Sequence, residues 1–130
     1  MKISVIIHGS PYSSQSAISA LAFSKAAVKS GHEIYQAFFY HDGVFNSTAL
    51  SMPAQDEKFP GQLWAEFASQ EKIKLVSCIS SASRRGIHDD SEAQRHELQS
   101  VNLNTTYEIA GLGELVEASL ASDRTITFGA

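Results

Sequence analysis

The chain has 130 residues, of which 43% are hydrophobic and 18% are charged, and its formal net charge at pH 7 is -4. These values are ordinary for a protein that buries its own core, so we expect one domain over residues 1–130 and exclude a disordered chain. The acidic balance provides no strong positive field for a phosphate backbone, which argues against direct nucleic-acid binding.

The first third of the chain predicts a strand, a helix and a second strand. Residues 3–7 form a β-branched apolar run that is typical of a strand buried on both faces. This run is too short for a signal-peptide core or a membrane span. Apolar side chains recur at helical spacing over residues 16–30 and Gly31 follows, which predicts the first crossover helix. Residues 33–40 are rich in apolar and aromatic side chains and predict the second strand.

The middle of the chain predicts an irregular excursion followed by a helix, a strand and a short helix. The polar stretch 46–60 contains two prolines and is expected to be an irregular functional loop. An amphipathic pattern predicts a helix over residues 62–69, and alternating apolar residues predict the third strand over residues 72–78. Residues 79–85 could form a short helix that ends at Gly86, so a helix would begin directly after Cys78.

The last third of the chain repeats this alternation. Asp89 and Asp90 are good capping residues for a helix over residues 92–99. A short strand over residues 106–109, a helix over residues 112–121 and a final strand over residues 125–128 complete the set of predicted elements.

The alternation of strands and helices predicts a three-layer α/β sandwich with about five mostly parallel strands and helices on both faces. The strand over residues 3–7 is expected near the centre of the sheet because that run is apolar throughout. In such folds, functional sites gather beyond the carboxyl ends of the strands. Cys78, the loop that begins at Gly9 and the turn over residues 41–43 should all lie at those ends.

Cys78 is the single cysteine of the chain, which excludes an intrachain disulfide and suits a reducing compartment, so we expect a cytoplasmic protein. On composition alone, a buried structural thiol is the more frequent interpretation. The predicted helix start directly after Cys78 changes the balance, because free backbone amides there favour the nucleophilic thiolate. The hydroxyls of Ser80, Ser81 and Ser83 could hydrogen-bond a thiolate or a terminal sulfur.

Arg84 and Arg85 follow within two turns of the cysteine. These cations could stabilise a thiolate or dock an acidic partner, or they could simply cap the end of the short helix. The five histidines show no pair at zinc-ligand spacing, and no complete nucleotide-binding motif is present. We therefore expect neither a metal nor a cofactor.

Several short motifs, in their order and spacing, resemble the DsrE-like proteins almost from end to end, and within them the cysteine-bearing TusD subfamily of the TusBCD sulfur relay. The motifs are Phe38-Phe39-Tyr40 with Gly43-Val44, Cys78 with Arg84-Arg85-Gly86, residues 111–115, residues 117–120 and Asp123-Arg124. The serine-rich stretch 80–83 departs from the alanine-rich run expected at that place.

The resemblance implies that Cys78 is the persulfide cysteine of a sulfurtransferase. It implies a TusA-like donor of sulfane sulfur, a TusE-like acceptor and a role in forming 2-thiouridine in tRNA. It also implies assembly with TusB-like and TusC-like subunits into a hexamer of two heterotrimers. With one cysteine, a persulfide cannot resolve as an internal disulfide, so a relay fits better than a thioredoxin-like cycle.

Two other functions remain open from the sequence. Relatives of the DsrE type work beside a sulfite reductase in sulfur-oxidising bacteria, so this chain could serve sulfur oxidation instead. It could also be a scaffold subunit with an inert thiol. Independently of the family, Phe45, Phe59 and Trp64 lie near an irregular segment, and we expect them to be buried at an oligomer interface.

Overall fold

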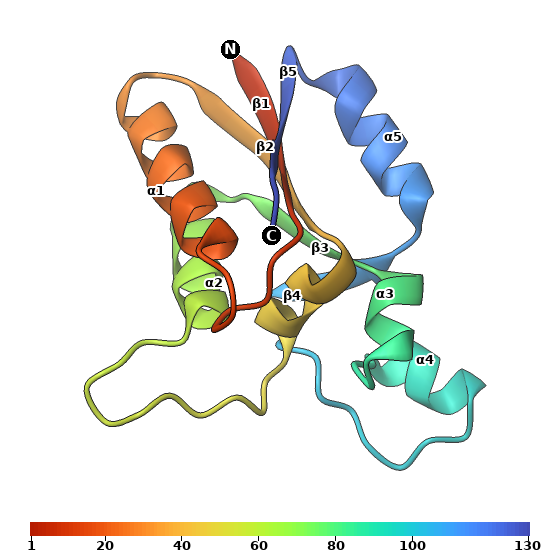
Figure 1. Cartoon of the computed structure of the whole chain (residues 1–130). Coiled ribbons are helices and arrows are strands. Elements are labelled where there is room, and N and C mark those ends of the chain that lie inside the picture. Colours follow the sequence, from red (N-terminus) through yellow and green to blue (C-terminus); the bar gives the residue numbers. More distant parts are fainter.

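All 130 residues are described by the structure, a computed structural model, and they form one five-stranded sheet (Figure 1). The strands are β1 (Lys2–Ile7), β2 (Glu33–Phe39), β3 (Lys74–Cys78), β4 (Tyr107–Ala110) and β5 (Arg124–Phe128). Their order across the sheet is β4-β3-β2-β1-β5, and every neighbouring pair is parallel. The predicted α/β sandwich is confirmed. The strand β1 is an interior strand as expected, but β2 occupies the central place.

The predicted helices are all present, with boundaries shifted by a few residues. They are α1 (Ser16–Lys29), α2 (Pro60–Glu71), α3 (Ile79–Arg84), α4 (Asp90–Arg95) and α5 (Leu112–Ala121). The start of α4 is fixed by the predicted cap, since the Asp89 carboxylate accepts a hydrogen bond of 2.9 Å from the Glu92 amide. A 3₁₀ helix, η1 (His41–Ser47), replaces the turn and the first part of the predicted irregular excursion.

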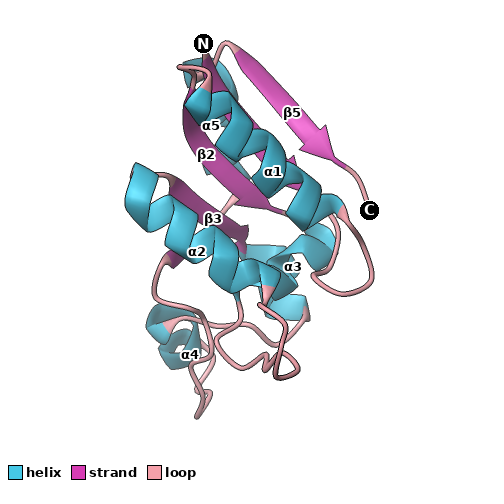
Figure 2. Ribbon diagram, turned by 90° about the vertical axis from the view of Figure 1, so that its left-hand side faces the viewer, coloured by secondary structure: helices cyan, strands magenta, loops and turns pink.

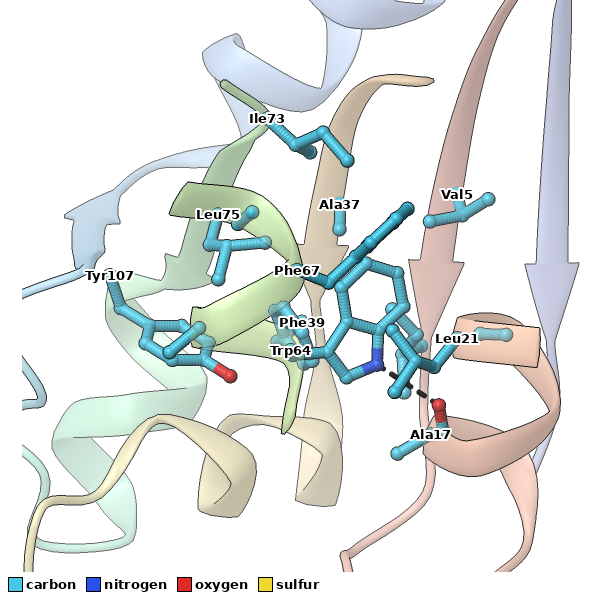
Figure 3. Packing of buried hydrophobic residues seen from close by; sticks show 14 of the residues in the cluster. Val5, Ala17, Leu21, Ala37, Phe39, Trp64, Phe67, Ile73, Leu75 and Tyr107 are labelled. Atoms are coloured by element: carbon cyan, nitrogen blue, oxygen red, sulfur yellow. Dashed lines mark hydrogen bonds between the residues drawn. The ribbon is translucent and has the colours of Figure 1, made fainter. Parts of the chain in front are cut away.

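The helices α1 and α2 cover one face of the sheet (Figures 1 and 2). Alternate residues of the central strands point toward these helices and join a cluster of 20 buried apolar residues. Trp64 of α2 lies in the middle of this cluster, is fully buried, and donates a hydrogen bond of 3.0 Å from Nε1 to the Ala17 carbonyl (Figure 3). This face holds most of the apolar core.

The helix α5 lies on the opposite face of the sheet, where Figure 1 shows it apart from α1 and α2. The strand residues that point this way form a cluster of only three buried apolar side chains, Phe38, Val76 and Cys78. The single buried residue of α5 is Ala118. The side chain of Cys78 therefore lies on the lightly covered face.

The oligomer interface was predicted because three aromatic residues were expected to need a partner chain for their burial, and this expectation is wrong for two of them. Trp64 and Phe59 are 0% and 6% exposed within the single chain, so they need no partner to be buried, and only Phe45 is partly exposed. They are buried because the chain after η1 returns to pack α2 against the sheet, a tertiary contact that local sequence does not reveal.

None of the helices combines the length and the apolar side chains that a membrane span requires.

Candidate active site

Cys78 lies where the sequence predicted it, at the junction of β3 and α3. It is the last residue of β3 and the N-cap of α3, and its backbone is still in a non-helical conformation. The apolar strand and the helix that follows it are both local consequences of the sequence. The chain therefore brings its only thiol to the carboxyl edge of the sheet, where sites of parallel α/β proteins form.

The thiol is covered by its own chain. Cys78 is 2% exposed and is buried with Phe38 and Val76. The partly buried side chains that pack against this cluster include Tyr40, at the end of β2, and Leu115, in the first half of α5. Any reaction of Cys78 with another protein therefore requires that part of this cover moves.

The serine hydroxyls that follow Cys78 do not converge on it. Ser81 is buried, and its Oγ accepts a hydrogen bond of 3.2 Å from the backbone N–H of His41. Ser80 is exposed and Ser83 is half-buried. None of the three hydroxyls makes a hydrogen bond to the sulfur of Cys78 in this arrangement. The predicted role of Ser80 and Ser81 at the sulfur stays a prediction.

The two arginines have different surroundings. Nε of Arg85 forms an ion pair of 2.7 Å with Oδ1 of Asp42, and its Nη1 donates a hydrogen bond of 3.0 Å to the Ser81 carbonyl. Arg85 therefore fastens the end of α3 to η1. Arg84 is exposed and forms no ion pair, so its guanidinium is available to an acidic partner.

The structure adds a group of aromatic and imidazole rings that the sequence analysis did not assemble. Tyr40 and His41 are stacked with ring centres 4.2 Å apart, and His8 meets His41 edge-on at 5.0 Å. Burial lowers the pKa of His8, and the nearby His41 lowers it further. The sequence held one sign of this group: His8 directly follows β1 and Tyr40 directly follows β2, so both lie at the carboxyl ends of strands.

The backbone of η1 is held against the end of β1, which keeps this edge of the sheet compact. A Cβ added at Gly43 would lie 2.1 Å from the Ile7 carbonyl oxygen, so only glycine allows this approach. The side-chain amide of Asn46 donates hydrogen bonds to the Gly43 and Gly9 carbonyls at 2.9 and 3.3 Å. The 41–43 turn and the Gly9 loop thus meet at the carboxyl edge, as predicted.

No other feature competes with this edge as a chemical centre. A cavity of about 670 Å³ lies between the loop after η1, the start of α2 and residues 103–106, and Cys78 does not line it. No group of three or more histidine, cysteine or acidic side chains is arranged to hold a metal ion.

Comparison with known proteins points to one family. The DsrE/DsrF-like family model matches residues 1–128. The chain is 46% identical to the DsrE protein of Allochromatium vinosum over 129 residues, which cover 99% of each chain. It is 41% identical over 128 residues to the sulfurtransferase TusD of Salmonella typhi, covering 98% of this chain and 100% of that one.

A solved structure shares the fold. The crystal structure of the YchN protein from E. coli matches with a TM-score of 0.76 and 22% sequence identity, covering 98% of this chain and 99% of that one. At this identity the likeness concerns the fold alone.

Proposed function

The chain belongs to the DsrE/DsrF-like family, and from this we propose that it is a sulfurtransferase that carries sulfur as a persulfide on Cys78. The observation that supports this most is the position of the only thiol at the carboxyl edge of β3, in a chain 41% identical to proteins named sulfurtransferase TusD. The other polar groups of this edge offer no alternative nucleophile of comparable strength at neutral pH.

The proposed chemistry needs one cysteine and no cofactor. The thiolate of Cys78 attacks the terminal sulfur of a donor persulfide, a new sulfur–sulfur bond forms at Cys78, and the donor leaves as a thiolate. A second protein thiolate then attacks the terminal sulfur on Cys78 in the same way. Because no second cysteine is present to form an internal disulfide, the sulfur is passed on to another protein.

We propose that access to the thiol is part of this function. With Cys78 2% exposed, a donor cannot reach it until Tyr40 or Leu115 moves aside. The cover on the α5 side is thin, so docking of a partner at this edge could open it at small cost. A permanently closed cover would instead favour the scaffold interpretation with an inert thiol.

The family resemblance supports a more specific proposal for the donor, the acceptor and the pathway. We propose a TusA-like donor, a TusE-like acceptor, a role in 2-thiouridine formation in tRNA, and assembly with TusB-like and TusC-like subunits into a hexamer of two heterotrimers. We propose a cytoplasmic location for the complex. The identity of 41% to TusD proteins over nearly the whole chain supports this choice.

Sulfur oxidation is the second candidate pathway. It is favoured by the 46% identity to the DsrE protein of Allochromatium vinosum, which is higher than the 41% identity to the TusD protein of Salmonella typhi. Sulfite reductase genes beside the gene for this chain would favour oxidation. A TusE-like partner without such genes would favour tRNA thiolation.

Mass spectrometry of the native chain after incubation with a persulfidated donor tests the carrier function. We expect the mass at Cys78 to increase by one sulfur atom. This added mass should be lost when the TusE-like acceptor is added. The matched control is Cys78→Ser, which should retain the fold because the change is nearly isosteric but should take up no sulfur. Uptake by Cys78→Ser, or no uptake by the wild type, would contradict the proposal.

A further inference from the structure

The cluster of His8, Tyr40 and His41 forms a continuous ring surface at the carboxyl ends of β1 and β2. The Tyr40 and His41 rings are nearly parallel, at 7°, with centres 4.2 Å apart. The His8 ring stands edge-on to both, 5.8 Å from Tyr40 and 5.0 Å from His41. His41 is exposed, whereas His8 and Tyr40 are half-buried. The cluster thus reaches from the sheet to the surface.

The strand pairing places this cluster in line with the thiol. Phe39 pairs with Ser77, so the residues that follow them, Tyr40 and Cys78, are neighbours across β2 and β3. Phe39 also pairs with the last residue of β1, so His8 stands on the other side of Tyr40. Tyr40 packs against the apolar cluster that contains Cys78. His8, Tyr40 and Cys78 therefore form one row on one face of three adjacent strands.

The position of His41 is held by contacts with the segment that follows Cys78. Its φ angle is +49°, a left-handed conformation that non-glycine residues rarely adopt unless other contacts hold it. Its N–H donates a hydrogen bond to Ser81, and the next residue, Asp42, forms the ion pair with Arg85. The backbone at His41 is thus fastened to α3, the helix that begins directly after Cys78.

The charged and titratable groups around the two imidazoles set the electrostatic surroundings of an approaching anion. Burial lowers the pKa of His8, and the nearby His41 lowers it further. The carboxylate of Asp42 is already paired with Arg85. On the neighbouring elements the remaining groups are the phenol of Tyr40, the thiol of Cys78, the exposed Arg84, and Glu114 of α5, which is bound to Lys74.

We propose that the imidazoles of His8 and His41 position the anionic persulfide of a donor at the edge of the sheet beside Cys78. This inference rests on the proposed function. The two imidazoles are then positioning residues, and the group that they attract is a perthiolate, the anionic form of a persulfide. Tyr40, between the imidazoles and the thiol, is then the part of the cover that the incoming sulfur displaces.

The transfer step balances without an oxidant or a reductant. The thiolate of Cys78 attacks the terminal sulfur of the donor persulfide, the sulfur–sulfur bond of the donor breaks, and its electron pair leaves with the donor thiolate. The sulfane sulfur ends on Cys78. A protonated imidazole of this pair can pass its proton to the departing thiolate and then takes a new proton from water.

The test compares an anionic sulfur donor with a neutral electrophile on the same thiol. Glutathione persulfide is the anionic sulfur donor, and iodoacetamide is the neutral electrophile that alkylates the thiol. The ratio of the two reaction rates at Cys78 is independent of the thiolate fraction and of how often the cover opens, because both reactions need an uncovered thiolate. The full-length proteins are the wild type, His41→Asn, His41→Arg and the control His32→Asn. Asparagine tolerates the left-handed conformation, and His32 lies at the opposite end of the sheet, beside the N-terminal amine.

We expect the ratio for the wild type to fall about fivefold as the pH rises through the imidazole range, since one nearby charge is lost. The pH dependence should weaken in His41→Asn, in which His8 is the one imidazole left at the site. His41→Arg should retain the high ratio at all pH values, and His32→Asn should behave like the wild type. In an NMR titration, the pKa of His8 should rise in His41→Asn, because the repulsion from His41 is gone.

The outcomes separate this inference from the carrier function. Sulfur uptake by the wild type with the same pH dependence in His41→Asn would overturn the role of the imidazoles alone. No uptake by the wild type at any pH would overturn the carrier function and the inference together. A His8 pKa that is unchanged in His41→Asn would show that the two rings do not act on one another, and would also overturn the inference.

Discussion

The two faces of the sheet are packed by different chemistry. On the α1 and α2 face, 20 buried apolar residues surround Trp64, and the buried hydroxyl of Tyr107 donates a hydrogen bond of 2.7 Å to the Gly61 carbonyl. On the α5 face, three apolar side chains are buried, and Gln36 is 1% exposed with no hydrogen-bond partner for its side-chain amide. The first face holds most of the apolar packing, whereas the face that carries the Cys78 thiol is packed more weakly.

Polar contacts tie the two ends of α5 to the sheet. Lys74 of β3 donates a hydrogen bond of 2.9 Å to Glu114 near the start of α5, and the Ser4 and Ser122 hydroxyls are 2.6 Å apart at its end. The outer side of α5 exposes Leu112, which is 48% exposed, and two further apolar residues at helical spacing. Local opening concentrates in regions with few buried apolar contacts, so we expect α5 to open before α1 and α2.

Removal of the central aromatic side chain should have the largest effect. Trp64→Ala deletes a fully buried indole and leaves the Ala17 carbonyl without its donor, so we expect a loss of about 3–5 kcal/mol in the free energy of unfolding. Urea denaturation measures it. Leu120→Ala, at a side chain that is 84% exposed on α5, is the control and should change stability by less than about 0.5 kcal/mol. Equal losses at the two positions would contradict the difference between the faces.

Leu115→Ala should uncover the thiol. Leu115 packs against the cluster of Cys78 and is only half-buried, so we expect a loss of about 1–2 kcal/mol and a several-fold faster reaction of Cys78 with iodoacetamide. The control is Val116→Ala on the exposed side of the same helix. Hydrogen exchange should accelerate in α5 and stay unchanged in α1. An unchanged alkylation rate would mean that α5 does not control access.

Gln36→Leu should stabilise the chain. The amide of Gln36 is buried without a partner, and an apolar side chain of similar size removes the cost of its desolvation, so we expect a gain of about 1 kcal/mol. Thermal and urea unfolding measure the gain. The same variant should slow alkylation of Cys78, because α5 then packs on a more apolar surface. A destabilised Gln36→Leu would indicate that the amide has a role that this arrangement does not reveal.

Glu114→Gln should have the smallest effect, about 0.5 kcal/mol or less, because both partners of its ion pair are about one-third exposed. The hydrogen bond from Lys74 to Glu114 raises the pKa of Lys74 above 10.5. Its contribution is therefore present below pH 10.5 and is lost as the pH rises through the raised pKa. The difference between wild type and variant, measured by urea denaturation, should be constant from neutral pH to about pH 9, decline as the pH rises through the raised pKa of Lys74 and vanish above it. A difference that persists there would exclude the Lys74 charge as its cause.

The sequence by itself determined the elements and the place of the thiol along the chain. The apolar runs, the cap at Asp89 and the glycine at position 86 act over a few residues, so each predicted strand and helix is present with small shifts. The helix directly after Cys78 was predictable for the same reason. The carboxyl-edge position of Cys78 then followed from the parallel arrangement that alternating strands and helices require.

Only the tertiary structure decided what surrounds that thiol. Three features depend on strand order and register: the burial of Cys78 in a cluster against which Tyr40 and Leu115 pack, the row that joins it to His8, and the ion pair of Arg85 with Asp42. The prediction that Trp64 lies at an interface was wrong for the same reason. These contacts join segments tens of residues apart, and their formation depends on how the whole sheet pairs, which local patterns of hydrophobicity do not encode.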